Sequence, residues 1–272
     1  MTEIVKYNNF LNSLRFQNFT IVDMNIFMTI CAKAKEKRDA EVTLTYDEII
    51  QLSDYKSKDI KRLTQDIVRM NNKLMKIVLN VEMPNGTICT FSLFKHFITN
   101  PIKKILSLKI NDEWAFVLNE LTRDFSQFEL NEFVSLNNRY TKALYRQLNQ
   151  YKSTGVYVCE IDKFRDIMDI PKTYSNKYIM DKVVKPSVQE LIDKNYFKDL
   201  TVISQYKNER GRPLKGYMFT FEKIIIEKKE EIVSEVIQDE VKQKPKNKFN
   251  DFPQRQYSKE EIDELEKRLL SK

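Results

Sequence analysis

The chain has 272 residues, 42% of them hydrophobic, and a formal net charge of +7. This length accommodates two domains of ordinary size, and the positive charge favours an anionic partner. No run of about 18 apolar residues occurs and the first ten residues are polar, so we expect neither a membrane span nor a secretion signal and place the protein in the cytoplasm.

The first predicted helix covers residues 22–36. Its apolar side chains recur at helical spacing on one face, and Asp23 can cap its start. A second, short helix is expected over residues 46–52. Thr45 and Glu48 have the spacing of a capping box, in which each side chain accepts a hydrogen bond from the backbone of the other.

A turn over residues 53–56 leads to a longer helix, from about Ser57 to Lys76, with one apolar stripe. Residues 56–76 carry seven Lys or Arg against two acids. A short helix, a turn and a longer helix form a helix-turn-helix, whose second helix can enter the major groove of DNA. A basic helix face that lies in water would give the same pattern. The candidate DNA contacts of this half are Lys56, Ser57, Lys58, Lys61, Arg62 and Gln65.

The pattern then changes to strands. Residues 77–83 and 87–94 are β-rich runs, joined by Pro84-Asn85-Gly86, a strong hairpin turn because Asn and Gly tolerate positive φ. Residues 104–110 give a third strand. A helix, a helix-turn-helix and then a hairpin are the elements of a winged helix in their usual order.

The same order recurs at a distance of about 115 residues, which is too long for a solenoid and fits a duplicated domain. The expected elements are helices over 138–151 and 162–168, a turn over 170–174, a helix over 175–194, and strands over 200–206 and 217–221. Pro186 removes a backbone donor inside the long helix, so we expect a kink there.

The second basic segment, residues 172–215, carries ten Lys or Arg against five acids. At the start of its long helix, Asn and Lys can bond base edges, while Ser, Tyr and Lys can hold phosphates. The candidates there are Tyr174, Ser175, Asn176, Lys177 and Lys182. The loop between the two strands resembles a wing that grips the DNA backbone or a minor groove, although a solvated hairpin tip would look similar. Its candidates are Lys207, Arg210, Arg212 and Lys215.

We therefore expect an α+β protein of two tandem winged-helix domains, over residues 1–124 and 125–226, and a flexible tail over residues 227–272. The tail is close to neutral in charge. Ser258 and Glu261 form a capping box for a short terminal helix, with a narrow apolar stripe made of Ile262, Leu265 and Leu269.

Enzyme classes find little support. The four glycines are not spaced to cradle phosphates, and His96 is the only histidine, so a nickase with a paired-histidine metal site is nearly excluded. We expect no catalytic residues, no metal and no cofactor. Cys31, Cys89 and Cys159 are odd in number and far apart, and we interpret them as buried small residues.

Five stretches of the chain have a recognisable pattern: Asn18-Phe19-Thr20, residues 42–48 (VTLTYDE), Phe128-Glu129-Leu130, residues 140–148 (YTKALYRQL) and residues 184–191 (VKPSVQEL). The most specific part is the helix with Tyr-Thr-Lys-x-Leu-Tyr-Arg followed by the helix with Lys-Pro. Together these stretches resemble the initiator replication proteins of theta-replicating (iteron) plasmids, of the low-GC Gram-positive type, and the similarity covers about residues 4–223.

The resemblance implies a protein without catalytic activity that binds repeated origin DNA (iterons) as a monomer. It implies a dimer, joined mainly through the first domain, that represses the protein's own promoter, and recruitment of the host initiator and helicase-loading proteins. Arg139 and Lys142 would face the DNA backbone. A two-domain winged-helix transcription repressor is the alternative function.

The tail carries a resemblance of its own. Residues 248–257 (KFNDFPQRQY) are similar to short C-terminal tails of replication and phage proteins from low-GC bacteria. Those tails are associated with contacts to other replication components. The candidate partner-binding residues are Phe252, Tyr257, Ile262, Leu265 and Leu269.

Overall fold

The structure, a computed structural model, describes residues 3–35, 37, 41–82, 85–112, 117–118 and 124–223. By their contacts, the residues up to Ile226 form one unit and residues 227–272 form a second. The predictions made for the tail lie outside the described residues. The division of the first unit at residue 124 stays a prediction.

Helix α2 (Ile21–Ala34) is the first long helix and is buried over most of its length. It begins with a capping box: Thr20 Oγ1 accepts from the Asp23 backbone N at 3.2 Å, and Asp23 Oδ2 accepts from the Thr20 N at 2.8 Å. The predicted cap, Asp23, is therefore wrong by position, since Thr20 is the N-cap and Asp23 is the third helical residue. The helix starts earlier because both residues share the capping.

Helices α3 (Tyr46–Leu52) and α4 (Ile60–Leu74) form the first helix-turn-helix. The capping box of Thr45 and Glu48 is confirmed. Helix α4 begins three residues later than predicted, because the Asp59 carboxylate accepts from the backbone N of Lys61 and of Arg62. The predicted apolar stripe of α4 is buried at Leu63, Ile67, Met70 and Leu74.

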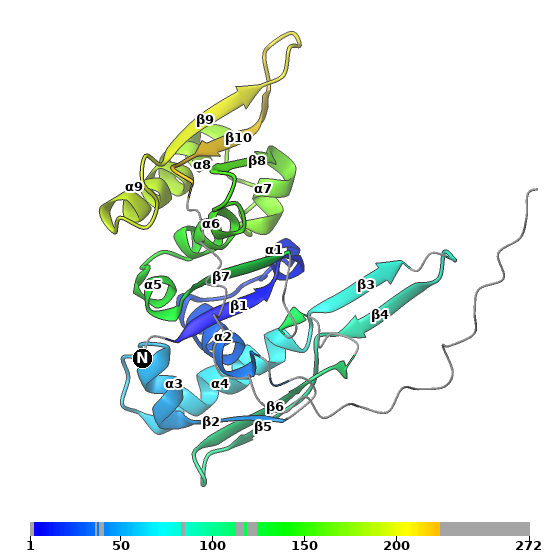
Figure 1. Cartoon of the computed structure of the whole chain (residues 1–272), viewed down its shortest axis with the longest axis vertical. Coiled ribbons are helices and arrows are strands. Elements are labelled where there is room, and N and C mark those ends of the chain that lie inside the picture. The colour runs from blue at the N-terminus through cyan, green and yellow to red at the C-terminus, as the bar shows by residue number, and fades with distance from the viewer. Residues whose placement is uncertain are drawn as a thin grey trace, which may run out of the picture. The chain divides into compact units, whose positions relative to one another are not determined.

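A three-stranded sheet of order β2-β6-β5 completes this winged helix: β2 (Val42–Thr45), β6 (Ile105–Ile110) and β5 (Phe94–Asn100). All pairs are antiparallel, with Leu44 opposite Leu106 and Leu106 opposite Thr99. Leu44, Leu106 and Leu108 are fully buried. The hairpin that stands in the place of the wing is therefore β5–β6 (Figure 1).

The hairpin that the sequence pattern predicted is present but forms a separate two-stranded ribbon, β3 (Val78–Glu82) with β4 (Ile88–Ser92). Gly86 has φ +78°, in line with the predicted turn, and Asn85 Oδ1 accepts from the Thr87 backbone N. The third predicted strand, β6, pairs with β2 and β5 instead of with this ribbon. Local turn chemistry fixes a hairpin, whereas burial of apolar faces decides which hairpin joins the sheet.

A pair of short strands joins distant parts of the chain. Strand β1 (Ile4–Asn8) pairs antiparallel with β7 (Phe125–Glu129), and each leads into a short helix, α1 (Phe10–Ser13) and α5 (Leu130–Ser135) respectively. Neither strand was predicted, because the partner of each lies more than a hundred residues away. Val5 and Tyr7 are fully buried in this layer.

The second set of elements repeats the order of the first. It comprises α6 (Arg139–Gln150), β8 (Val156–Glu160), α7 (Ile161–Ile167), α8 (Asn176–Ile179), η2 (Met180–Val184), α9 (Lys185–Asp193), β9 (Thr201–Tyr206) and β10 (Leu214–Thr220). Helices α3 and α7 both have seven residues, and their starts, 46 and 161, differ by 115. The sheet order β8-β10-β9 matches β2-β6-β5. The predicted duplication is therefore present in topology.

The long helix predicted over residues 175–194 is interrupted by the π-helical stretch η2, which ends at Val184, two residues before Pro186. Proline cannot donate a backbone hydrogen bond, and its ring crowds the carbonyl four residues earlier. The wider π spacing relieves both problems. The sequence thus indicated the place of the irregularity but not its form.

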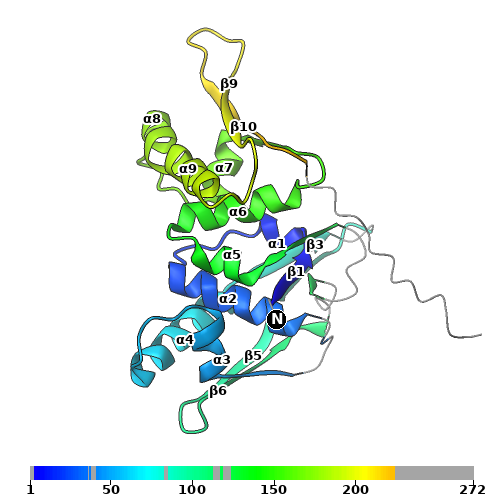
Figure 2. The ribbon, with the colours of Figure 1, turned by 60° about the vertical axis from the view of Figure 1, so that its left-hand side comes forward.

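Helix α6 lies at the centre of the unit (Figure 2). It packs on α9 and β8 as well as on β7 and α1. Four of its buried polar side chains bond to the protein, namely those of Lys142, Arg146, Gln147 and Asn149, whereas the buried Thr141 Oγ1 has no hydrogen-bond partner among the described residues. Arg146 donates to Leu11 O at 2.7 Å and Gln147 to Asn12 O at 2.8 Å, so α6 is tied to the first segment of the chain.

Candidate DNA-binding surface

The first helix-turn-helix presents most of its predicted contacts to solvent. Lys56, Lys58, Lys61, Arg62 and Gln65 are exposed, and Ser57 is half-buried. The buried stripe of α4 fixes its orientation, which leaves these side chains on the face away from the core. Because Asp59 already caps the backbone N–H groups of Lys61 and Arg62, the basic side chains are the groups that can meet phosphate oxygens here. This geometry is compatible with DNA binding.

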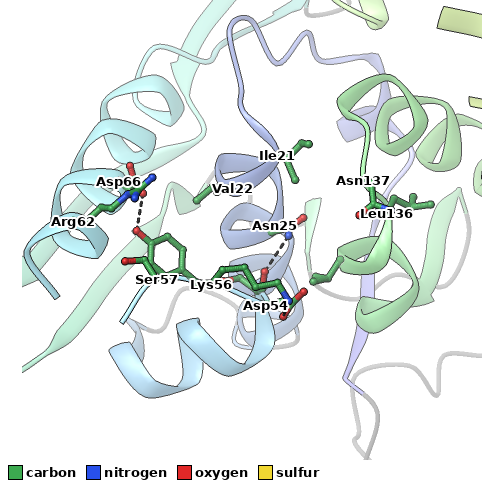
Figure 3. Close-up of a pocket in the computed structure, with 13 residues that line it drawn as sticks. Ile21, Val22, Asn25, Asp54, Lys56, Ser57, Arg62, Asp66, Leu136 and Asn137 are labelled. Atoms are coloured by element: carbon green, nitrogen blue, oxygen red, sulfur yellow. Dashed lines mark hydrogen bonds and ion pairs between the residues drawn. The ribbon is translucent and has the colours of Figure 1, made fainter. Parts of the chain in front are cut away.

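A cleft of about 520 Å³ lies beside this turn, bordered by α2 and by the segment between α5 and α6 (Figure 3). Asn25 supports the turn from α2 by donating to Ser53 O at 3.0 Å. Tyr55 in the turn donates to Asp66 Oδ2 of α4 at 2.7 Å, and burial together with Asp66 raises the pKa of Tyr55 to about 12. Both bonds hold the turn against its neighbouring helices, and Arg62 lies at the rim of the cleft.

The second helix-turn-helix exposes Ser175, Asn176, Lys177 and Lys182, with Tyr174 half-buried. Ser175 Oγ caps α8 by accepting from the Tyr178 N at 3.2 Å. The predicted set therefore gathers at the exposed start of α8, except Lys182, which lies one turn further on in η2.

Arg165 of α7 was missed by the sequence reasoning. Its guanidinium donates to Tyr174 O at 2.8 Å and to Asn176 Oδ1 at 2.9 Å. Because Oδ1 of Asn176 is occupied, the amide group presents its N–H donors outward, which restricts the base atoms it can meet to acceptors. The only sequence signal was a basic residue in the short helix that precedes the turn.

The β9–β10 loop holds its four predicted basic residues, Lys207, Arg210, Arg212 and Lys215, in exposed positions. Two backbone bonds close the loop, from Lys207 N to Pro213 O and from Arg212 N to Glu209 O, each 2.9 Å. Gly211 and Arg212 have φ of +84° and +43°. The arginines are therefore carried on a defined turn at the tip of a hairpin.

The structure contradicts one predicted contact. Lys142 is fully buried, and its Nζ donates to Phe133 O at 2.5 Å and Val134 O at 3.2 Å. It cannot face a DNA backbone in this conformation, because α6 packs against neighbours on several sides. Arg139 is about one-third exposed, stacks on Tyr140, and pairs with Asp169 at 3.4 Å; its role on DNA stays a prediction.

The β5–β6 hairpin, the wing of the first winged helix, has a basic tip that the sequence reasoning missed. Ile102 is 92% exposed and lies beside the exposed Lys103 and Lys104. Asn100 Oδ1 accepts from the backbone N of Ile102 at 3.1 Å and of Lys103 at 2.9 Å, which orders the turn. The available signal was the sequence Asn-Pro-Ile-Lys-Lys at residues 100–104, between two apolar runs.

Other features of the described residues bear on function class. Cys31 and Cys159 are buried and Cys89 is half-buried, all as free thiols. Within the described ranges, no group of three or more His, Cys, Asp or Glu side chains could hold a metal ion. Nor does any helix in the described part of the chain have the length and apolar character needed to cross a membrane.

Comparison with known proteins gives matches over nearly all of this unit. The family model "Initiator Replication protein, WH1" matches residues 4–149, and "Initiator Rep protein, WH2" matches residues 160–221. A "Probable replication protein rep" of Bifidobacterium longum (strain NCC 2705) is 32% identical over 222 residues, which cover 80% of this chain and 72% of the relative. A solved structure, the Pi initiator protein in complex with iteron DNA, has a TM-score of 0.61. At 13% identity, over 81% of this chain and 97% of the other, it shows the fold of two winged helices.

Proposed function

The chain belongs to the initiator replication protein family. We propose that it starts plasmid replication by binding repeated origin DNA with both of its winged helices, and that it does so without a catalytic step. A protein that binds one DNA site through two winged helices, its two DNA-binding heads, can bend the DNA and ease strand opening. The deformation costs several kcal/mol, which the contacts must offset.

The observation that carries this proposal is the repeated placement of basic side chains. Each helix-turn-helix exposes them at the start of its second helix, with Lys58 and Lys61 in one copy and Lys177 in the other. Each sheet adds a basic hairpin tip. Phosphate contacts of this kind position a protein on DNA, and polar groups such as the Asn176 amide can read base edges.

Partners beyond DNA belong to the same proposal. A dimer joined through the first winged helix would repress the protein's own promoter, and the monomer would bind the origin repeats. Host initiator and helicase-loading proteins would be recruited through the C-terminal tail. Family membership supports the dimer and the recruitment of host proteins, and the resemblance of residues 248–257 to the tails of other replication proteins supports the part given to the tail.

A plasmid that lacks an initiator gene but carries the DNA flanking this gene tests the function. Supplying the chain from a second plasmid should restore replication, and supplying a variant with Lys58, Lys61 and Lys177 changed to Ala should not. The matched control changes three lysines outside both helix-turn-helix motifs and both hairpin tips, Lys76, Lys109 and Lys198, to Ala. Replication that does not depend on the chain would contradict the proposal.

The alternative is a two-domain transcription repressor of the same architecture. A reporter gene behind the chain's own promoter separates the two functions in the same cells. Repression of the reporter without any plasmid replication would favour the repressor.

A further inference from the structure

The two helix-turn-helix motifs end their first helix in the same way. Asp54 and Asp169 both adopt the left-handed conformation, with φ of 51° and 50°. Around Asp54, the Tyr55 N bonds Ile50 O at 3.0 Å, and around Asp169 the Ile170 N bonds Arg165 O at 2.9 Å. These are the bonds of a helix C-terminal motif in which Gly or Asn is the favoured residue. The backbone therefore gives the two aspartates equivalent places, 115 residues apart.

Their side chains have different surroundings. The Asp54 carboxylate is 52% exposed and pairs with Lys56, itself 81% exposed. The Asp169 carboxylate is 14% exposed. It accepts from Arg15 Nε at 3.1 Å, Arg15 Nη2 at 2.9 Å, the Asn18 backbone N at 3.0 Å and Arg139 Nη1 at 3.4 Å. The residues that hold it come from the loop between α1 and α2 and from the first turn of α6.

An acidic side chain directly after the C-terminus of a helix is unfavourable when only the helix itself is considered. The C-terminus of a helix carries partial negative charge, so a carboxylate there is unfavourable. At Asp54 water and an exposed lysine surround the charge. At Asp169 the two guanidinium groups balance it, and charge-assisted bonds to arginine are among the stronger hydrogen bonds in proteins. The contacts, more than the turn, account for an acid at position 169.

The bonds continue from Asp169 to the start of the second recognition helix. The Ile170 N bonds the carbonyl of Arg165, and the Arg165 guanidinium bonds Tyr174 O and Asn176 Oδ1. The turn, Arg165 and the start of α8 are therefore bonded to one another and should move as one body, so that a shift of the turn against the first winged helix carries the residues proposed to read bases with it. Arg15 and Asn18 lie in the segment that leads into α2 of the first winged helix.

We infer that Asp169 is a positioning residue that ties the first winged helix to the turn of the second helix-turn-helix, and so sets the distance between the two DNA-binding heads. Helix α6 already connects the two winged helices, because Arg146 and Gln147 donate to backbone carbonyls of the first segment of the chain. Asp169 adds a second connection, in the turn between α7 and α8. The effect on DNA rests on the proposed function, whereas the effect on distance does not.

The first test uses the full-length protein without DNA. Spin labels on Gln65→Cys in α4 and Gln189→Cys in α9, both exposed helix positions, report the distance between the heads, with Cys89→Ser to remove the half-buried thiol. Asp169→Gly keeps the left-handed conformation but removes the carboxylate, and Asp54→Gly is the matched control. Arg15→Ala breaks the same contact from the other side and leaves the turn intact.

The distance distribution should broaden in the Asp169→Gly and Arg15→Ala variants and stay narrow in the Asp54→Gly variant. An unchanged distribution in both of the first two variants overturns the inference, whatever DNA binding shows. Broadening of the same size in the control overturns it as well, because the effect would then belong to the turn and not to the bridge. If Asp169→Gly does not fold, Arg15→Ala decides.

The second test uses unlabelled protein with two duplexes, one with a complete origin repeat and one with only the half that footprinting assigns to the second winged helix. Asp169→Gly should bind the complete repeat more weakly by about 5–150-fold, the usual range for coupling between two sites. It should bind the half repeat as the wild type does. An equal loss on both duplexes overturns the inference, since Asp169 would then act on the reading helix alone. If the wild type binds neither duplex while the distances behave as expected, the proposed function fails and the positioning role stands.

Discussion

Lys142 is a charged side chain inside the protein, and its setting explains how the chain tolerates it. Its Nζ lies 2.5 Å from Phe133 O and 3.2 Å from Val134 O, at the C-terminal end of α5, and 4.6 Å from the centre of the Phe133 ring. A cation there is favoured by the helix dipole and by the ring face. Burial acts in the opposite direction and lowers the pKa of Lys142 to about 7. The side chain therefore serves the packing of α5 on α6 and not DNA.

Replacing Lys142 by Met should change how stability depends on pH. Between pH 7 and the ordinary lysine pKa of about 10.4, the unfolded chain holds this proton and the folded chain has released it. Stability of the wild type should therefore rise with pH by up to about 1.4 kcal/mol per pH unit from this group, relative to Lys142→Met. Urea unfolding at about pH 7.5 and pH 9 measures the difference, with the exposed Lys198→Met as control. Parallel curves for wild type and Lys142→Met would contradict the pKa shift.

At Asn176 and Lys177 the expected effect is on specificity. Asn176→Ala and Lys177→Ala should each weaken binding to the origin repeat by about 1–3 kcal/mol and relax discrimination at one base position. Binding to a panel of single-base-pair substitutions measures both effects. Arg165 donates to Asn176 Oδ1, so Arg165→Ala should give a milder form of the same phenotype. Unchanged specificity in the first two variants would move base reading to residues 58–65.

The β9–β10 hairpin illustrates how a strand pair presents charge. Gly216 allows β10 to approach β8 closely, because a Cβ atom there would meet Cys159 O at 2.1 Å. Strand β10 is therefore held against β8 as far as Gly216, and Arg210 and Arg212 lie beyond that point, at the tip of the hairpin. The β5–β6 hairpin has the same place in the first sheet and offers Lys103 and Lys104. The two sheets therefore share one topology, but the tips of their wings carry different basic residues.

Removing both wing arginines tests what this element contributes. Arg210→Ala combined with Arg212→Ala should weaken binding to the origin repeat and to unrelated duplexes by similar factors, because backbone contacts carry no base information. Fluorescence anisotropy on both duplexes measures the two losses. Asn208→Ala, an exposed change in the same loop, is the control. A loss restricted to the origin repeat would show that the wing reads bases.

For the molecule as a whole, the number of basic contacts predicts the response to salt. The two heads and their wings offer on the order of six to ten phosphate contacts, so affinity should fall by roughly 10³–10⁵ between 50 and 200 mM salt. The slope of log affinity against log salt, measured on one duplex, gives the number of contacts. A flat response would contradict a binding surface made of basic side chains.

The tail should serve replication without serving DNA recognition. Residues 226–272 carry eleven basic and twelve acidic side chains, which leaves little attraction for phosphates. The helix that the sequence predicts there, with the stripe Ile262, Leu265 and Leu269, would be too short to be stable alone in water and would suit a groove on a partner. Truncation after Lys229 should leave affinity for the repeats unchanged while plasmid replication falls. A truncated chain that binds DNA poorly, or that replicates normally, would contradict a docking role.

The sequence alone determined the features whose causes are local. Capping residues and apolar spacing predicted helices α2, α3, α4, α6 and α7 within a few residues, Asn85-Gly86 predicted a hairpin, and Pro186 marked the interruption before α9. The order of these elements predicted two winged helices. The sequence pattern also predicted correctly that most candidate contacts are exposed. A basic residue that lies off the apolar stripe of an amphipathic helix usually faces the solvent.

Only the tertiary structure decided features that depend on partners far away in the chain. Strand β1 is defined by β7, and β6 joins β2 and β5, so local periodicity could not say which hairpin is the first wing. Lys142 looked like a surface cation, but α6 is packed on several sides and buries it. Asp54 and Asp169 look alike in sequence, and only the folded chain brings Arg15 to one of them. Burial and ion pairing are properties of surroundings, and these surroundings form only when distant segments pack together.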